Sequence, residues 1–319
     1  MLTILRNDYS RMRKRLAGIL IFTVVTLVAM GLAVYLAHQP VKGHIALVTA
    51  NAAAPVHSAR LDVTVLRKAP PESALVRGQY DAFVFDEGGG RYRVQTLRNA
   101  QFKAMVQALL TDPQAKVPSQ SGERGVGENV IGFSMLFLLM STITNLLMFG
   151  EDKEQGQLSR IEVTPVSGVG YLAGHCVYAL TMFLPPLVLL AGLQEAGVAI
   201  GFSLGMYALL FLALAVLGIP LALLLYTLLD KADNATMLGS SILVFTTVLA
   251  GGFYANSRKN AVLDTLVGAL PQKQLLLFAA QAEKGVGVAH AGHLLYVFAW
   301  GVALFALSGF LLRRRRQRG

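Results

Sequence analysis

Residues 16–37, LAGILIFTVVTLVAMGLAVYLA, form a run of 22 residues without a charge. A helix rises about 1.5 Å per residue, so this run would measure roughly 33 Å and cross a hydrocarbon core of about 30 Å. A secretory signal has a shorter apolar region that ends in small residues at the cleavage site. Tyr35 stands where such a small residue is needed. The run is therefore predicted to be a retained membrane anchor.

Five more uncharged runs follow, at residues 129–150, 171–194, 196–229, 234–257 and 286–312. The whole chain of 319 residues is 54% apolar and only 14% charged, against roughly 25% charged in soluble domains. We therefore predict an all-α polytopic membrane protein with six transmembrane helices. Residues 253–285 are more polar, with one clear helical run at 261–270, and are expected to form a hairpin on the outer side.

Residues 38–129 differ from the apolar runs, because they hold eleven Lys/Arg and eight Asp/Glu. Short alternating segments at 44–48, 61–66 and 80–85 predict strands, and 101–110 predicts a helix. This stretch is expected to be a small α+β extracytoplasmic domain between the first and second spans. Residues 130–312 would then hold the other five spans, and 313–319 a basic cytoplasmic tail.

The net charge of +10 is concentrated at the two ends of the chain. On a soluble protein such a charge would suggest nucleic acid binding, but here it follows the positive-inside rule and places both termini in the cytoplasm. We accordingly expect no nucleic acid partner, and a location in the cytoplasmic membrane of a bacterium. The basic residues that flank the first and last spans are Arg6, Arg11, Arg13, Lys14, Arg15, Arg313–Arg316 and Arg318.

No motif for catalysis or phosphate binding occurs in the chain. The pattern G-x-x-x-x-G-K-[ST] is absent, as are H-E-x-x-H and G-x-S-x-G. His290 and His293 lie three residues apart and could pair on a metal, but without a carboxylate nearby a surface position is the better interpretation. The spans carry almost no charge, which argues against an ion-driven carrier. The sequence therefore predicts no catalytic residue, no metal site and no cofactor bound by this chain.

The distinctive segment lies between the second and third spans, at residues 151–171. An acidic turn with Glu151, Asp152 and Glu154 precedes Gly156, a short amphipathic stretch and a Thr-Pro stop. Such a segment can lie along the membrane face with an apolar edge free for a partner. Its net charge of −2 disfavours the alternative, a helix that touches only the anionic headgroups of the inner leaflet.

This segment resembles the loop E-x-E-x-G-T-L-E-x-(L/I)-x-V-(T/S)-P of type-2 ABC transporter permeases, which precedes a Tyr-Leu-x-Gly-Lys start to the third span. Gln157 stands where Thr is usual, and His175 where Lys is usual. Residues 251–253 and 269–271 resemble that family's late outer hairpin, without its first Pro. The residues that match the loop pattern are Glu151 or Asp152, Glu154, Gly156, Leu158, Ile161, Val163, Thr164, Pro165, Tyr171, Leu172 and Gly174.

The resemblance implies a coupling helix that docks on a separate ABC ATPase subunit. Two such ATPases would bind ATP and Mg, and the permease would pair with a second copy or a paralogue. The basic residues Arg11, Arg13, Lys14 and Arg15 would form an interfacial segment that touches lipid headgroups and the ATPase, or else act as a topology signal alone. The residues expected to transmit force are Glu151, Glu154, Gly156, Leu158, Ile161, Thr164 and Pro165.

Two polar stripes are candidates for a cargo path. Ser134, Ser141 and Asn145 share one face of the second span, and the fifth span offers Thr246 and Thr247. The alternative for each residue is helix packing, in which the side chain bonds across helices or to its own backbone.

The sequence thus predicts an exporter permease for an amphipathic drug, peptide or lipid-like cargo. The rival interpretation is a membrane sensor that does not transport and whose external domain binds a ligand.

Overall fold

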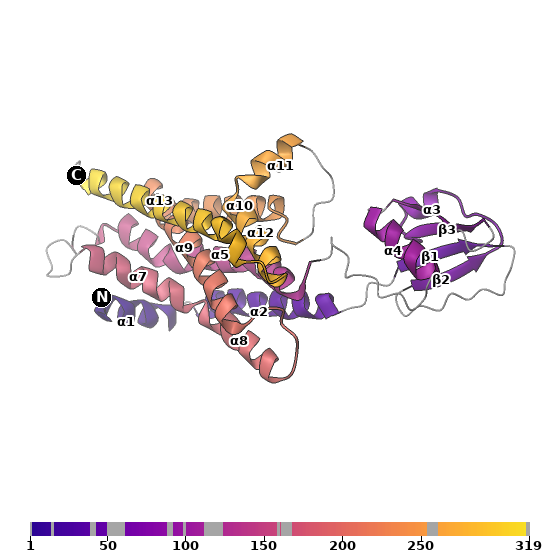
Figure 1. The fold of residues 1–319 in the computed structure, drawn as a ribbon. Helices are drawn as coiled ribbons and strands as arrows, with labels where there is room; N and C mark the ends of the chain where they lie inside the picture. The colour runs from indigo at the N-terminus through magenta and orange to yellow at the C-terminus, as the bar shows by residue number, and fades with distance from the viewer. Residues whose placement is uncertain are drawn as a thin grey trace. The chain divides into compact units, whose positions relative to one another are not determined.

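The computed structural model describes residues 2–13, 16–38, 43–49, 61–87, 92–97, 100–111, 124–157, 160, 168–253 and 261–316. The chain forms two compact units (Figure 1). One comprises residues 1–37 and 124–319, and the other comprises residues 38–123.

The larger unit is helical, and most of its helices are strongly apolar. Five stretches of its described residues are long and apolar enough to cross a membrane: residues 20–37, 126–154, 170–195, 204–228 and 288–314. The chain is therefore a multi-pass membrane protein. The helices of this unit are α1 (Leu2–Met12), α2 (Leu16–His38), α5 (Val126–Glu154), α7 (Gly168–Thr181), α8 (Leu184–Glu195), α9 (Leu204–Leu228), α10 (Ala232–Leu249), α11 (Ala261–Gly268), α12 (Pro271–Glu283) and α13 (Ala291–Arg316).

The span expected at 234–257 corresponds to α10, which is not among the five stretches. Asp233 and Asn234 lie in its first turn and hydroxyl side chains follow, so its mean hydropathy is lower than that of the other spans. Residues 254–257 of the expected span lie outside the described part of the chain.

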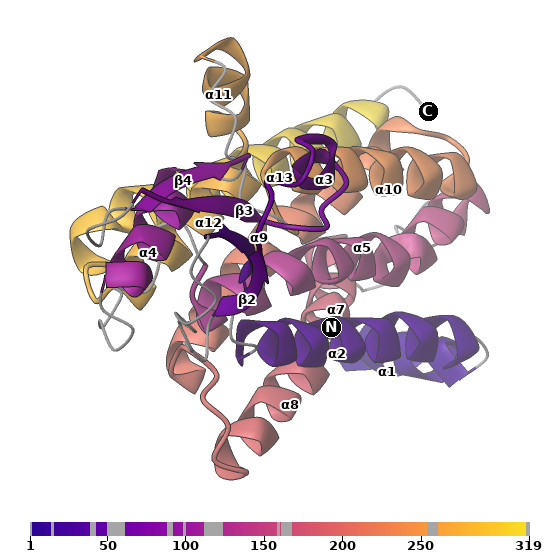
Figure 2. The same ribbon diagram turned by 90° about the vertical axis from the view of Figure 1, so that its right-hand side faces the viewer.

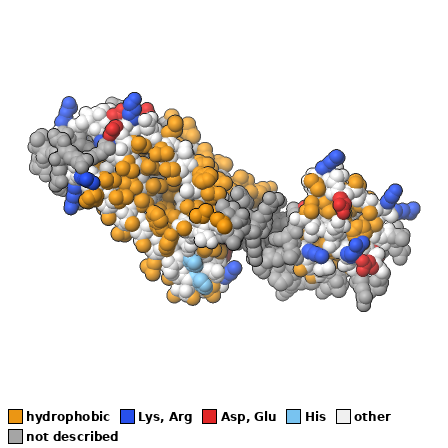
Figure 3. Space-filling view, turned by 90° about the horizontal axis from the view of Figure 1, so that it is seen from above, with side chains coloured by type: hydrophobic (Ala, Val, Ile, Leu, Met, Phe, Trp, Pro, Cys, Tyr) orange, Lys and Arg blue, Asp and Glu red, His pale blue; other side chains and the backbone are white. Residues whose placement is uncertain are grey.

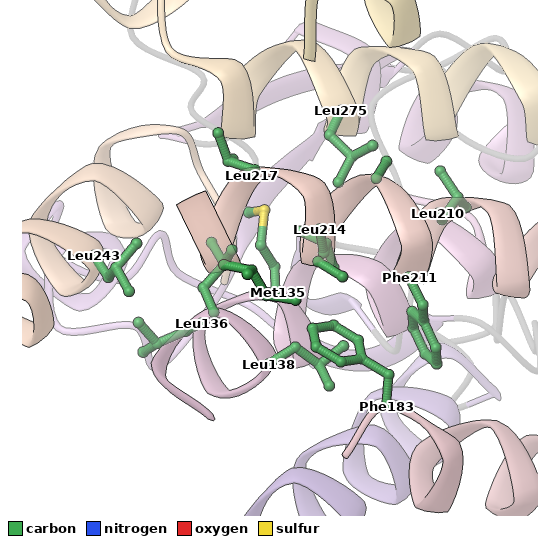
Figure 4. Packing of buried hydrophobic residues seen from close by; sticks show 14 of the residues in the cluster. Met135, Leu136, Leu138, Phe183, Leu210, Phe211, Leu214, Leu217, Leu243 and Leu275 are labelled. Carbon is green, nitrogen blue, oxygen red and sulfur yellow. The ribbon is translucent and has the colours of Figure 1, made fainter. Parts of the chain in front are cut away.

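The core of this unit is built around α9, which packs between α5 and α13 (Figures 1 and 2). Leu210, Leu214 and Leu217 of α9 are buried with Met135 and Leu138 of α5 (Figure 4). By contrast α2 and α13 expose many large apolar side chains. On the face shown in Figure 3, hydrophobic side chains cover the middle of the unit and most charges gather at one end. This distribution is expected of helices that face lipid.

Prolines account for the main irregularities in the apolar helices. The expected span 171–194 is interrupted at Met182 and Phe183, and α8 then begins with Pro185 in its first turn. Pro220 lies inside α9 and lacks an N–H, so it leaves the carbonyl of Val216 without its usual partner in the helix. Gly301 of α13 packs against that carbonyl, where a Cβ atom would come within 2.4 Å of the oxygen.

The expected outer hairpin contains two helices, not one. The predicted helical run at 261–270 is found as α11, and α12 follows it. Pro271 is the first residue of α12, a position where a missing N–H has no cost. The hairpin is therefore a helical pair, and α12 packs against α5 and α13.

The smaller unit is a four-stranded sheet of order β2-β1-β3-β4. Its strands are β1 (Gly43–Val48), β2 (Leu61–Leu66), β3 (Ala82–Asp86) and β4 (Tyr92–Thr96). β1 pairs parallel with β2 and β3, and β4 pairs antiparallel with β3. Because side chains alternate along a strand, Ala82 and Val84 pack with helix α4 (Ala100–Thr111), while Phe83 packs with the short helix α3 (Ser73–Val76) on the other face. The expected strands and the expected helix are present, and β4 and α3 are additions.

Candidate functional site: the C-terminal end of α5

The acidic turn of the 151–171 segment is continuous with a membrane helix. α5 does not stop at residue 150 but runs on to Glu154, and Gln155 caps it. Gly156 follows with a positive φ of 66°, a conformation that a side chain would strain, so the chain leaves the helix there. Four residues that sequence analysis assigned to coupling lie outside the described residues: Leu158, Ile161, Thr164 and Pro165.

Lys153 joins this turn to the end of α9. Its ammonium donates to the carbonyls of Tyr226, Thr227 and Leu229 at 2.9, 3.0 and 2.7 Å. Carbonyls in the last turn of a helix have no partner within the helix and carry a partial negative charge. Lys153 therefore satisfies three of them at once and holds α5 against α9.

Glu154 joins the same turn to the start of α10. Its carboxylate Oε2 accepts a hydrogen bond from the backbone N–H of Ala232 at 2.9 Å. This is a helix cap supplied by a distant part of the sequence, and it places a negative charge at the N-terminus of α10, where the helix dipole favours one.

Glu151 and Asp152 join the turn to α1 and α7. Arg11 of α1 lies 3.5 Å from the carboxylate of Glu151 and 2.7 Å from that of Asp152. Tyr171, the start of the expected third span, donates its hydroxyl hydrogen to Asp152 at 2.8 Å. The four residues 151–154 thus contact α1, α7, α9 and α10, so a displacement of this turn reaches four helices.

The basic segment before α2 is described in part. Arg13 is exposed, whereas Lys14 and Arg15 lie outside the described residues. Arg11 is partly buried and contacts the carboxylates of Glu151 and Asp152.

Four of the five polar residues proposed for a cargo path, Ser134, Ser141, Asn145 and Thr246, make side-chain hydrogen bonds within the chain, whereas the buried Thr247 hydroxyl makes none with the described residues. Ser134 is buried and donates to the carbonyl of Val130 in its own helix at 2.6 Å. Asn145 donates to Ser141 at 3.0 Å. Thr246 donates to Ile242 and accepts from Gln272 of α12, and Thr247 is fully buried.

The opposite end of α5 is held by a second set of charges. Arg124 donates to the carbonyls of Gly251 and Gly252 after α10 and lies 3.1 Å from Glu128. Glu283, at the end of α12, accepts from the N–H groups of Gly127 and Glu128 at 2.8 and 2.9 Å. Burial lowers the pKa of Arg124, and the Glu128 carboxylate acts in the opposite direction. The guanidinium remains a cation at any physiological pH.

An apolar groove of about 340 Å³ lies between α7, α9 and α13. Its lining includes Cys176, Leu180, Leu212, Pro220, Gly301 and Phe305. Gly301 stands where α13 approaches the turn of α9 that Pro220 interrupts.

The histidine pair considered for a metal has other contacts. The rings of His290 and His293 stack at 6.2 Å, and His293 Nδ1 lies 2.5 Å from Gln274 Oε1. Among the residues that the structure describes, no group of three or more His, Cys, Asp or Glu side chains is arranged to hold a metal ion.

A comparison of the sequence with known families identifies its relatives. The profile of the family described as ABC-2 family transporter protein matches residues 91–310, most of the chain. The chain belongs to the ABC-2 transporter family. Its members are permeases that associate with an ABC ATPase subunit, so this chain is a transport permease. None of the curated proteins compared with the chain is similar enough to count as a match.

Sequence analysis missed two residues, one in the last turn of α5 and one on α7 beside that turn. Lys153 entered only the net charge of the 151–171 segment, yet its ammonium donates three hydrogen bonds to carbonyls at the end of α9. His175 was noted only as a departure from the ABC-2 pattern, yet it is buried beside two carboxylates. The sequence did carry a signal for His175, because this residue stands near the start of a membrane span at a position where the ABC-2 pattern has Lys.

Proposed function

We propose that this ABC-2 permease is the membrane-spanning subunit of an ATP-driven exporter, and that residues 151–171 are its coupling segment. The observation that carries the proposal is the set of contacts made by residues 151–154, which reach α1, α7, α9 and α10. A sensor that does not transport has no need to tie one loop to four helices.

The remaining features follow from this assignment. Both termini and the 151–171 segment lie on the cytoplasmic side, α10 is the fifth of six spans, and residues 38–129 form an extracytoplasmic domain. The basic ends of the chain support this orientation through the positive-inside rule.

The working complex contains two permease chains and two ATPase subunits, which bind ATP and Mg. On α10 the large apolar side chains Met237, Val244 and Phe245 are exposed, and such a surface suits a second copy or a paralogue. The cargo is an amphipathic drug, peptide or lipid-like molecule, consistent with the apolar groove and the scarcity of charge in the spans.

The test is reconstitution of the chain with the ABC ATPase encoded beside it. We expect the two to co-purify and to hydrolyse ATP faster when cargo is present. The substitution Glu154→Ala should keep ATP hydrolysis but uncouple it from export, because the coupling segment loses its contact with α10.

Glu195→Ala is the matched control, since Glu195 is an exposed glutamate at the end of α8. Normal export by the Glu154→Ala variant would contradict the coupling assignment. Absence of any complex with the ATPase, together with ligand binding by the external domain, would favour the sensor.

A further inference from the structure

The groove between α7, α9 and α13 lies at the middle depth of the membrane helices. Val216 is the middle residue of the apolar stretch 204–228, and Gly301 is the middle residue of the stretch 288–314. The two residues contact each other where α13 packs on α9. Because a helix rises about 1.5 Å per residue, this point is roughly 18 Å from either end of α9. The hydrocarbon core of a bilayer is about 30 Å thick, so the groove lies at the depth of the hydrocarbon and not of the headgroups.

The described residues that line the groove are all apolar. Pro220 leaves the carbonyl of Val216 without its partner in the helix, but Gly301 covers that oxygen from the side of α13. An apolar space of this kind stays free of water, and a polar group placed in it would lose its hydrogen bonds. The groove therefore accepts a hydrocarbon and excludes a headgroup.

The walls of the groove are held in place by contacts outside it. α13 packs closely along α9 (Figure 1), and α7 packs less closely against α9, so a space remains between α7 and α13. Another side of α7 is fixed by the buried ionic cluster of Asp8, Asp152 and His175, in which His175 Nδ1 lies 2.8 Å from the Asp8 carboxylate. A groove that is formed in advance binds its ligand without a cost of rearrangement.

The dimensions of the groove suit one acyl chain. It extends from Leu212 to Pro220 along α9, about 12 Å at the rise of a helix, and the chains of one leaflet fill about half of the 30 Å core. Its volume of about 340 Å³ is at the smaller end of the roughly 300–1,000 Å³ range of ligand pockets. Leu212, Val302 and Phe305 remain 43%, 66% and 48% exposed in the single chain. An acyl chain between them would touch protein on several sides, and van der Waals attraction grows with the number of contacts.

We propose that this groove is a binding site for one acyl chain of a phospholipid from the surrounding bilayer. The acyl chain lies over the middle of α9 and fills the space that separates α7 from α13. The bound lipid stabilises the folded protein, because it contacts three helices at once. The proposal needs only a protein that spans a membrane, so it does not depend on the direction of transport or on the ATPase.

The first experiment measures the melting temperature of the purified protein as lipid is added. The protein is kept in digitonin, a detergent whose apolar part is a rigid steroid and not an alkyl chain. We expect dioleoyl phosphatidylcholine to raise the melting temperature by about 5 °C at saturation, because a ligand that binds only the folded state stabilises it. Dioleoyl phosphatidylglycerol should give the same rise, and dihexanoyl phosphatidylcholine a much smaller one. The absence of a rise, or a rise that depends on the headgroup and not on the acyl chain, would overturn the proposal.

Two substitutions fill the groove from different helices. Cys176→Phe enlarges a lining side chain of α7, and Val302→Trp enlarges one of α13. Both variants should lose the rise in melting temperature that the lipid causes. Val188→Trp on α8 is the matched control and should keep the rise, because Val188 is 69% exposed, close to the 66% of Val302, and does not line the groove. An undiminished rise in both filling variants would overturn the proposal.

A retained brominated lipid provides the decisive readout, since bromine atoms on an acyl chain quench the fluorescence of a Trp that they touch. Trp300 is the only Trp of the chain, so in a Trp300→Phe background a new Trp reports on one place. Phe305→Trp places it at the groove, and Phe310→Trp places it on an exposed part of α13 outside the groove. Both variants are reconstituted with dibrominated phosphatidylcholine and then extracted again in digitonin. We expect the Phe305→Trp variant to remain quenched and the Phe310→Trp variant to recover its fluorescence.

Three results of these measurements would overturn the proposal. Recovery of fluorescence by both variants would show that the groove holds lipid no better than the exposed surface does. Cargo that restores the fluorescence of the Phe305→Trp variant would assign the groove to cargo. A Val302→Trp change that converts a dimer into a monomer on size-exclusion chromatography would assign the groove to a second copy of the chain.

Discussion

The two ends of α5 are both fastened by charged side chains, but in different ways. At the N-terminal end, Arg124 and Glu283 bond to backbone groups of the turn after α10 and of α5 itself. At the C-terminal end, Asp152 also bonds to other side chains, on α1 and α7. Backbone groups at helix ends stay where the helix is, whereas a contact between side chains can be remade in another geometry. We infer that the contacts at the N-terminal end of α5 keep one geometry, whereas the contacts at its C-terminal end change when the neighbouring helices move.

The substitution Arg124→Met is expected to have the largest effect. It leaves the partly buried Glu128 without its close cation and removes the donor to the carbonyls of Gly251 and Gly252. Loss of one partner of a buried ion pair costs about 3–5 kcal/mol, so the melting temperature should fall sharply. Lys284→Met changes an exposed cation close to the same end and should have little effect. Similar melting temperatures for the two variants would show that the contacts of Arg124 do not hold this end of α5 in place.

Lys153→Met tests the C-terminal end and should have a smaller effect on stability. The change removes three hydrogen bonds from an ammonium to carbonyls at the end of α9. Water can reach that surface in part, so the loss should be near that of a single bond to a charged group, about 1.5–3 kcal/mol.

The Lys153→Met variant should also hydrolyse ATP at a rate that no longer rises when cargo is added. An ATPase assay of the reconstituted complex measures this rate. Lys231→Met, an exposed lysine at the start of α10, is the control. If Lys153→Met melts early but remains fully coupled, the contact with α9 is structural only.

Ser134→Ala, in the middle of α5, should have the smallest effect. The Ser134 hydroxyl bonds to a carbonyl of its own helix, and Ala is a better helix former, so stability should stay within about 0.5 kcal/mol of the parent. The informative measurement is the cargo concentration that half-maximally stimulates hydrolysis. A shift in that concentration would mean that the stripe of Ser134, Ser141 and Asn145 lines a cargo path and does not merely pack.

The sequence predicted the architecture better than the contacts. Runs of apolar residues locate α2, α5, α9 and α13 because length and hydropathy are local properties. Alternation located three of the four strands. β4 was missed because only Val94 of its residues is fully buried, which leaves a weak period-two signal.

The site was predicted only where it depends on local sequence. The acidic turn and Gly156 were recognised from the pattern, and the structure places them at the end of α5. Asp8 and His175 are 167 residues apart in the numbering of the chain, yet 2.8 Å apart in space. No local pattern shows that the single acid of the basic flank turns inward, so the sequence offered no reason to assign Asp8 a role.

The position of the single cysteine has a practical consequence. Cys176 lines the groove between α7, α9 and α13 and directly follows His175 of the ionic cluster. Successive residues of a helix point about 100° apart, so one side of α7 holds an ion pair while the next side meets an apolar space. A fluorescent or spin-labelled thiol reagent would therefore mark the natural chain at one known point. Its signal would report a change in the surroundings of α7 without any change to the sequence.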